Sequence, residues 1–449
     1  MGQLDASIVT VAFPTLKHTF DAGQGSVTWV GLAYLLTLVA LVTAFGRVAD
    51  MVGHKLLYTY GFMVFIVGSA LCGFAPNLGS LDAFRVLQAV GAAMLQANSV
   101  AIIALAMPRH KLGRAIGIQG AAQALGLAFG PSVGGLLIAF GGWRLIFFVN
   151  VPVGIVATAL AWFLVPRSRE LRPWVRFDWT GLALFIPTVT ALLYLVSLGN
   201  ERGWLSPGIL TALAVCVVGG VLFLRHERRF ATPMLDLNLF RRVPFSAGVS
   251  SGLLSYLVMF GALYSVPFFL EDGPGHLSPG LTGLELTVMP AALGVVAPFA
   301  GRAADVVGAR LFTVAGMGLS ALSLAVLGLV HPSGAALLLA LVGLGLGLGL
   351  FTPPNNAAIM GSVPREQAGE ASGVLNMTRG MGTAMGLAST SLVLGLVAGA
   401  HAEVPGLIVR GFTASALFLA GIAAAAMGLA ALRGPVSVAP GTPRGWTEA

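Results

Sequence analysis

The chain is a succession of long apolar runs that short polar or glycine-rich segments separate. A helix needs roughly 20 mostly apolar residues to cross the hydrocarbon core of a bilayer, which is about 30 Å thick. The runs near that length predict fourteen transmembrane helices. They are residues 1–16, 27–46, 56–75, 81–107, 113–139, 145–165, 179–198, 208–224, 245–270, 281–300, 311–330, 335–360, 370–399 and 411–432.

The scarcity of charge supports a membrane protein over a soluble one. Of the 449 residues, 57% are hydrophobic and only 9% are charged, whereas roughly 25% are charged in a soluble globular protein. So few charges cannot cover the surface of a water-soluble fold of this size. We therefore expect an all-α integral membrane protein whose outer surface contacts lipid.

The positions of the basic residues predict the orientation. With the amino terminus inside, 19 of the 25 Lys and Arg residues fall in inner loops or the carboxyl-terminal tail, and four fall in outer loops. This is the bias of membrane proteins toward positive inner loops, and it explains the net charge of +8 without a nucleic-acid partner. We expect a multi-pass protein of the plasma membrane with both termini in the cytoplasm.

One octapeptide occurs twice. Residues 46–53 read GRVADMVG and residues 301–308 read GRAADVVG, so the copies start 255 residues apart. Each copy joins the second and third helices of a set of six. The 255-residue offset is longer than six helices require, and the extra length matches two inserted helices. Two similar bundles around a central pathway are typical of secondary transporters. The predicted parts are a six-helix bundle (1–165), a two-helix insert with basic cytoplasmic loops (166–243), a second six-helix bundle (244–432) and a cytoplasmic tail (433–449).

Five stretches carry a resemblance to a known family. They are LDASIVTVAFP (4–14), GRVADMVGHK (46–55), RVLQAVGAA (85–93), GLAFGPSVGG (126–135) and WRLIFFVNVPVG (143–154). With them the chain resembles the major facilitator superfamily, and within it the fourteen-helix drug:proton antiporter family, over nearly its whole length. The resemblance implies the major facilitator fold, alternating access and efflux of drugs in exchange for protons, as in antibiotic resistance, with no enzymatic activity.

Asp5 and Arg85 are ionisable residues inside predicted spans, and such residues are functional candidates because a charge in lipid is costly. Pro14 and Lys17 mark the outer end of the first helix, which places Asp5 about 18 Å deeper, near the midplane. The resemblance implies that Asp5 carries the proton and that Arg85 is a fixed cation beside it. The alternative interpretation of Asp5 is that it is an exposed acid near the amino terminus. Asp82 is another candidate partner for Arg85.

The first predicted helix is short. From Met1 to Leu16 it spans about 24 Å, less than the hydrocarbon core requires. We therefore expect the natural chain to start upstream of Met1.

The repeated octapeptide predicts a tight turn, because glycine adopts a positive φ without steric cost. In the family this element is thought to latch the two halves together on the inner side. A solvated turn that only fixes topology is the alternative, and the chain departs from the family pattern at Met51, where a basic residue is usual, and at His54. The latch candidates are Gly46, Asp50, Gly53, Arg114 and Asp305.

The stretch GLAFGPSVGG places small residues four apart on one face of the fifth helix, at Gly126, Gly130 and Gly134. This spacing lets another helix approach closely, and Pro131 favours a bend. Together with Gly135, the stretch matches the family motif of exporters that exchange substrate for protons. Generic close packing is the alternative interpretation.

Polar and aromatic side chains on the spans are candidates for the substrate cavity, with ordinary packing as the alternative. Arg379 lies near the inner end of its helix, and we expect it to snorkel toward the surface rather than line the cavity. The cavity candidates are Tyr34, Gln88, Gln96, Tyr256, Phe260, Tyr264 and Glu271.

These observations predict a proton-coupled exporter of small amphipathic, hydrophobic or cationic compounds such as drugs. The expected partners are the lipid bilayer, protons and a small-molecule substrate, and the expected state is a monomer. The sequence contains no phosphate-binding loop and no HExxH or CxxC pattern, so we expect no cofactor, no metal and no catalytic residue. A facilitator for a sugar, peptide or siderophore on the same fold, and a receptor that transports nothing, are the alternatives.

Overall fold

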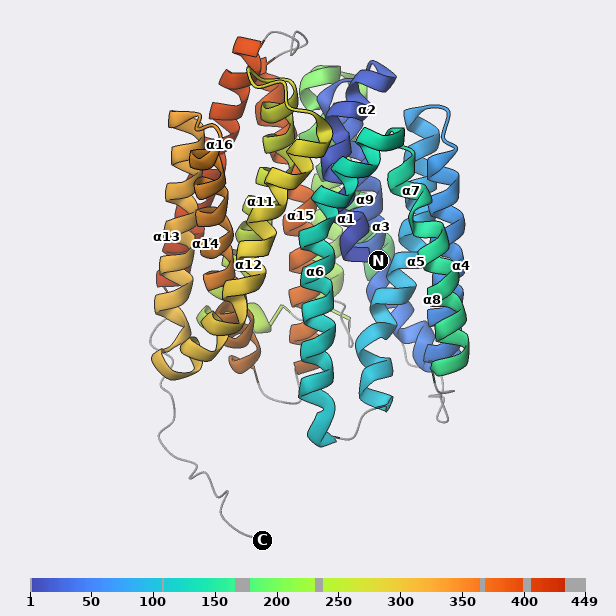
Figure 1. The fold of residues 1–449 in the computed structure, drawn as a ribbon. Helices are drawn as coiled ribbons and strands as arrows, with labels where there is room; N and C mark the ends of the chain where they lie inside the picture. The colour runs from blue at the N-terminus through green and yellow to red at the C-terminus, as the bar shows by residue number, and fades with distance from the viewer. Residues whose placement is uncertain are drawn as a thin grey trace.

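The computed structural model describes residues 2–106, 109–165, 178–230, 237–363, 368–398 and 405–432, and every regular element in these ranges is helical (Figure 1). The elements are α1 (Gly2–Ile8), η1 (Val9–Ala12), α2 (Phe13–Phe20), α3 (Gln24–Val52), α4 (His54–Gly73), α5 (Leu78–Ala106), α6 (Arg109–Gly141), α7 (Leu145–Phe148), α8 (Asn150–Leu164), α9 (Trp179–Arg202), α10 (Pro207–Glu227), η2 (Leu239–Arg241), α11 (Val243–Glu271), α12 (Pro279–Val307), α13 (Ala309–Val330), α14 (Ala335–Gly361), α15 (Ala368–Ala398) and α16 (Pro405–Ala431).

Twelve helical segments in the described residues are long and apolar enough to cross a bilayer. Two of the fourteen predicted spans do not meet this criterion. The first, 1–16, is divided among α1, η1 and α2. The fifth, 113–139, lies within α6, where the apolar piece found among the described residues, Leu125–Gly141, is too short to meet the criterion. The all-α membrane architecture is therefore confirmed, and the count of fourteen is not.

Two prolines explain where predicted single helices are divided. A proline inside a helix has no N–H to donate, and its ring collides with the carbonyl group four residues earlier. Pro14 follows the 3-10 segment η1, and Pro152 follows the break at Val149 between α7 and α8. The spans predicted as 1–16 and 145–165 are therefore interrupted rather than continuous.

The two copies of the octapeptide end their helices in the same way. Gly53 follows α3 with φ 101°, and Gly308 follows α12 with φ 100°. Their N–H groups donate to Ala49 and Ala304, each at 2.9 Å. Most of each copy is helical, and the turn is a single glycine, so the predicted loops are shorter than expected. A positive φ favours glycine at both turns.

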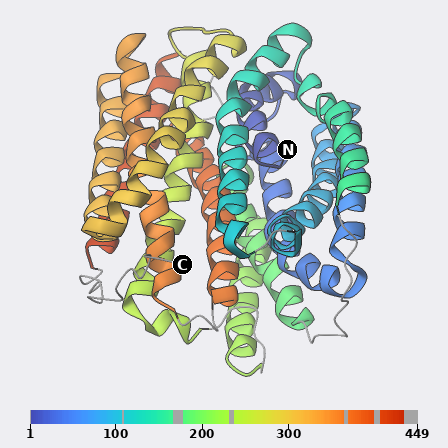
Figure 2. The same cartoon turned by 60° about the horizontal axis from the view of Figure 1, so that its bottom comes forward.

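The helices before and after the α9–α10 pair pack in matching ways. We call α1–α8 the N-terminal set and α11–α16 the C-terminal set, and Figure 2 shows them side by side. Contacts of α3 with α5, α4 with α5, α4 with α8 and α1 with α6 correspond to contacts of α12 with α14, α13 with α14, α13 with α16 and α11 with α15. The repeat in the sequence therefore reflects a repeat in packing.

The α9–α10 pair lies against the boundary between the two sets (Figure 2). Helix α9 contacts both α3 and α15. The indole of Trp29 donates to Ser197 at 3.0 Å, and the Ser26 hydroxyl donates to Glu201 at 3.0 Å. Only 17% of the α10 span is buried, against 78% of the α11 span. Helix α10 therefore lies at the lipid boundary, and α11 lies in the interior.

The two sets meet closely toward one end of the bundle, where α2 ends and α12 begins. We call this end the upper face (top of Figure 1) and the end with Gly53 and Gly308 the lower face. Near the upper face α6 crosses α12 at two glycines. A Cβ on Gly135 would collide with the backbone of Pro279, and one on Gly283 would collide with the carbonyl group of Pro131. Only small residues permit this crossing.

We expect Gly283→Ala to destabilise the protein by roughly 1–3 kcal/mol, because the added methyl group must displace backbone of the other set. Gly294→Ala in the same helix is the matched control, since a Cβ there meets nothing within 4 Å. Thermal unfolding of the purified variants in detergent measures the difference. Equal midpoints for the two variants would contradict the close crossing.

Candidate functional site

Helix α1 carries Asp5 into the interior of the N-terminal set. The side chain is 0% exposed, and its partners come from α5 and α8. An ionised carboxylate at such a position needs a counter-charge and hydrogen-bond donors, because burial removes its hydration.

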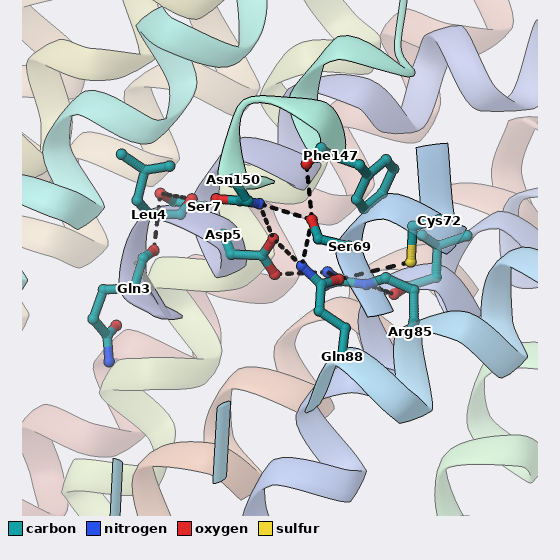
Figure 3. Close-up of polar contacts among 11 residues, drawn as sticks. Gln3, Leu4, Asp5, Ser7, Ser69, Cys72, Arg85, Gln88, Phe147 and Asn150 are labelled. Carbon is teal, nitrogen blue, oxygen red and sulfur yellow. Dashed lines mark hydrogen bonds and ion pairs between the residues drawn. The ribbon is translucent and has the colours of Figure 1, made fainter. Parts of the chain in front are cut away.

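Three side chains donate to the Asp5 carboxylate (Figure 3). The Arg85 Nη1 lies 2.6 Å from Oδ2, while Gln88 Nε2 and Asn150 Nδ2 lie 2.8 Å and 3.1 Å from Oδ1. All three are N–H donors. A carboxylate only accepts hydrogen bonds, whereas a carboxylic acid must also donate one, so this arrangement suits the ionised form.

Arg85 is held in place on its other sides. Its Nε donates to the backbone oxygen of Val30 at 2.9 Å, and its Nη1 donates to Gln88 Oε1 at 2.7 Å. The guanidinium lies 4.2 Å from the centre of the Tyr34 ring. The side chain is 1% exposed, and an arginine stays charged at such depth. It is a fixed cation paired with Asp5 rather than with Asp82.

Ser69 of α4 completes the network. Its hydroxyl oxygen accepts from Gln88 at 3.1 Å and from Asn150 at 3.2 Å, and its O–H donates to the backbone oxygen of Phe147 at 2.8 Å. The network therefore joins α1, α4, α5, α7 and α8. We call Asp5, Ser69, Arg85, Gln88 and Asn150 the buried polar network.

The sequence predicts Asp5 and Arg85 as the buried charged residues, but it does not predict the other members of the buried polar network as their partners. Gln88 was predicted for the substrate cavity, and Ser69 and Asn150 were not singled out. A polar side chain in an apolar run is the signal that could have found Asn150, which interrupts the stretch WRLIFFVNVPVG.

The glycine face of α6 packs directly against α1. A Cβ on Gly130 would collide with Ser7, one on Gly134 would collide with Ile8, and one on Gly126 would contact Leu4. These three glycines therefore let α6 support the helix that carries Asp5. Gly135 and Pro131 belong to the neighbouring face, which crosses α12.

A hydrogen-bonded group joins the two sets between the cavity and the upper face. The Tyr264 hydroxyl lies 3.0 Å from Thr28 Oγ1 and 3.0 Å from Gln24 Oε1. The same Thr28 oxygen lies 2.9 Å from Ser391 Oγ. All four side chains are buried. We call Gln24, Thr28, Tyr264 and Ser391 the upper seal.

Further contacts between the sets reinforce the upper seal. The rings of Phe13 and Tyr264 pack with centroids 5.2 Å apart. Closer to the surface, His18 Nε2 of α2 lies 2.9 Å from Asp272 Oδ1, just after α11. These contacts join the two sets at the upper end of the boundary.

A central cavity of about 370 Å³ lies between the two sets. Four predicted cavity residues line it: Tyr34, Gln96, Tyr256 and Phe260. The polar residues Asn356, Asn376 and Arg379 line it as well. The expectation that Arg379 snorkels to the surface is therefore wrong, because it lies in the cavity wall.

Three predicted cavity residues lie elsewhere. Gln88 faces Asp5 and Ser69 within the buried polar network. Tyr264 belongs to the upper seal, and Glu271 is the last residue of α11 at the upper face. Their residue types are typical of a cavity wall, but their positions along and around their helices place them elsewhere.

The predicted latch is described only in part. Gly53 forms its turn as expected, and Gly46 lies within α3. The side chains of Asp50, Arg114 and Asp305 lie outside what the structure describes, so their roles stay predictions. His54 Nδ1 lies 2.8 Å from Asn98 Oδ1 of α5, which fixes the start of α4 against the last third of α5. In the described ranges, no group of three or more His, Cys, Asp or Glu residues could hold a metal ion.

A two-set helical membrane fold with an ion pair buried in one set and a cavity between the sets is typical of a secondary transporter. A family model described as Major Facilitator Superfamily matches residues 1–273 and 248–447. The chain belongs to the major facilitator superfamily.

Two relatives are similar to the chain in sequence, and one solved structure is similar to it in fold. It is 36% identical over 395 residues to the multidrug resistance protein Stp of Mycobacterium tuberculosis, covering 87% of this chain and 73% of that protein. It is 36% identical over 391 residues to the riboflavin transporter RibZ of Clostridioides difficile, covering 86% of this chain and 84% of that protein. A bacterial homologue of the human lysosomal transporter Spinster, solved inward-facing and unoccupied, shares the fold with a TM-score of 0.69 at 14% identity, over 96% of this chain and 94% of that one.

The buried ion pair makes a stability prediction. Arg85→Met or Asp5→Leu alone should destabilise the protein by roughly 3–5 kcal/mol, because each leaves its former partner buried without a counter-charge. The double variant should lose clearly less than the sum, since no uncompensated charge remains. Unfolding of the purified variants measures the coupling, and strictly additive losses would contradict a direct pair.

Proposed function

We propose that this chain is a proton-coupled exporter of small amphipathic compounds that works by alternating access. The proposed architecture has fourteen spans, with six-helix bundles at 1–165 and 244–432, an inserted pair at 166–243 and a tail at 433–449. The name of its relative Stp, a multidrug resistance protein, supports drugs as cargo. The observation that carries the proposal is the Asp5–Arg85 ion pair beside the central cavity.

The distribution of basic residues supports a cytoplasmic lower face. The turns at Gly53 and Gly308 lie at this face, and the basic residues Lys55, Arg302 and Arg310 flank them. Positive residues favour the inner side of a membrane. In this orientation the upper face is extracellular. We propose that both termini are cytoplasmic, with Gly2 at the start of α1 in the wall of the central cavity.

The order of residues along three helices supports a state closed to the outside. On α3, Thr28 of the upper seal lies above the cavity residue Tyr34. On α11, Tyr264 lies above Tyr256, and on α15 Ser391 of the seal lies above the cavity residues. The seal thus separates the cavity from the upper face, and substrate would enter from the cytoplasmic side.

Asp5 is the proposed proton carrier. Ala6 follows it in the chain and lines the cavity, as does Gly2 one turn away, so Asp5 lies next to the cavity wall. The three N–H donors around Asp5 in this state favour the carboxylate. A proton bound when the outer side is open would therefore be released when the upper seal closes.

The glycine contacts supply the coupling between protonation and movement. Neutralising Asp5 weakens its pairing with Arg85 and so changes how tightly α1 is held. Helix α1 rests on Gly130 and Gly134 of α6, and the adjacent Gly135 crosses α12 of the other set. The proton and the substrate each bind one access state better than the other, and each shifts the population accordingly.

We expect Asp5→Asn to abolish proton-driven accumulation of substrate in inside-out vesicles while counterflow exchange of labelled substrate continues. Asparagine keeps the shape of the side chain but cannot gain and lose a proton. Asp21→Asn is the matched control, because Asp21 is exposed and asparagine tolerates its left-handed backbone at φ 46°.

Counterflow in the same vesicles shows that the variant is inserted and folded. Gradient-driven transport by Asp5→Asn at the wild-type rate would remove Asp5 from the mechanism.

A facilitator for another small solute is the second candidate, and similarity to a protein named as a riboflavin transporter favours it. A facilitator would equilibrate its solute without regard to the proton gradient. Wild-type transport that is unchanged when an ionophore collapses the gradient would support this candidate against the exporter.

A further inference from the structure

Helix α15 presents a polar face to the central cavity. Asn376, Arg379, Gly380 and Thr383 follow one another at helical spacing, and all four line the cavity. Arg379 is the one charged side chain among the described lining residues. The cavity therefore carries a fixed positive charge on the wall that the C-terminal set provides.

The guanidinium of Arg379 is held against an aromatic ring, and its Nε has no described hydrogen-bond partner. It lies 5.3 Å from the centre of the Tyr256 ring, which orients the guanidinium plane. Its Nε is buried, yet no hydrogen-bond partner for it exists in the part of the chain that the structure describes. A guanidinium has five N–H donors in a rigid fork that matches a carboxylate. A buried donor without a partner is costly. An anionic group bound in the cavity would give the guanidinium a counter-charge and acceptors.

The cavity wall holds no described carboxylate that could neutralise Arg379 or attract a cation. Asp5 is the acid beside the cavity, and it already accepts from Arg85, Gln88 and Asn150. Charges interact more strongly inside a protein than in water. A cationic compound in this cavity would meet a like charge with no carboxylate to offset it.

The remaining walls suit a flat ring system. Tyr34, Met259 and Phe260 line the cavity together with Leu35, Leu38 and other apolar side chains. The volume of about 370 Å³ is at the small end of the range for ligand pockets. The amides of Asn356 and Asn376 add neutral hydrogen-bonding groups on the same side as Arg379.

We propose that the cavity selects apolar ring compounds that carry an anionic group, such as a carboxylate, and that Arg379 binds this group. The inference rests on the proposed transport function, because it assigns the substrate class of the same cavity. It replaces the cationic compounds expected from the sequence with compounds of the opposite charge.

Binding of three probes that share one ring system tests the charge preference. The probes are pyrene carboxylate, neutral pyrene methanol and the cation pyrenylmethyl trimethylammonium. Equilibrium dialysis against the full chain in lipid nanodiscs, with empty nanodiscs subtracted, gives the affinities without any proton gradient. The wild type should bind the carboxylate most tightly and the ammonium compound most weakly.

Arg379→Gln should weaken carboxylate binding by about tenfold to a hundredfold, the loss of one charge-assisted contact, and leave the alcohol within about threefold. Arg379→Lys should keep the preference for the anion. Arg225→Gln is the matched control, because Arg225 is exposed near the end of α10, away from the cavity. It should change none of the affinities.

Three results would overturn the inference: no specific binding of the carboxylate, ammonium binding as tight as carboxylate binding, or an equal loss for all three probes in Arg379→Gln. The last would make Arg379 a packing residue. A charge preference without proton-driven transport would refute the proposed function alone. Proton-driven transport without the preference would refute this inference alone.

Discussion

The ion pair between Asp5 and Arg85 is the interaction on which the rest of the structure depends. The two residues lie 80 positions apart in sequence and 2.6 Å apart in space, and both are almost fully buried. A buried charge is tolerated only with a counter-charge and a full set of hydrogen bonds. Gln88 and Asn150 supply those bonds, and Ser69 accepts from both of them. One proton on Asp5 therefore disturbs contacts among several helices at once.

Glycines of α6 link the helix that carries Asp5 to the boundary between the two sets. The same helix, α6, lies against α1 through Gly130 and Gly134 and against α12 through Gly135. Because the glycines have no side chain, each neighbouring helix lies close to the α6 backbone, and a shift of one helix changes the contacts of the next. The upper seal around Tyr264 then holds the sets together at the end that must open, with hydroxyl contacts that are individually weak.

The sequence was sufficient to single out Asp5 and Arg85, because an acid and an arginine in apolar runs are costly without a function. It left Asp82 as another candidate partner for Arg85, and the fold decides between the two. The matching ends of α3 and α12 were also predictable, since each copy of the octapeptide ends in a glycine. Amides and hydroxyls gave a weaker signal: Gln88 and Tyr264 were assigned to the cavity, because sequence does not show which helix each faces. The placement of Arg379 depends on the rotation of α15 about its axis, which packing decides. The helix breaks near Pro14 and Pro152 show how steric clashes of proline interrupt an apolar run.

The most direct test of the account is the separation of the upper ends of the two sets as a function of pH. Spin labels at Pro76 and Ser333, both exposed in upper turns, would report it in a background without Cys72 and Cys216. Because the donors around Asp5 favour the carboxylate in the sealed state, acidification should increase the population with distant labels, and Asp5→Asn should show that population at every pH. An Asp5→Asn variant that keeps the wild-type response to pH would contradict the account.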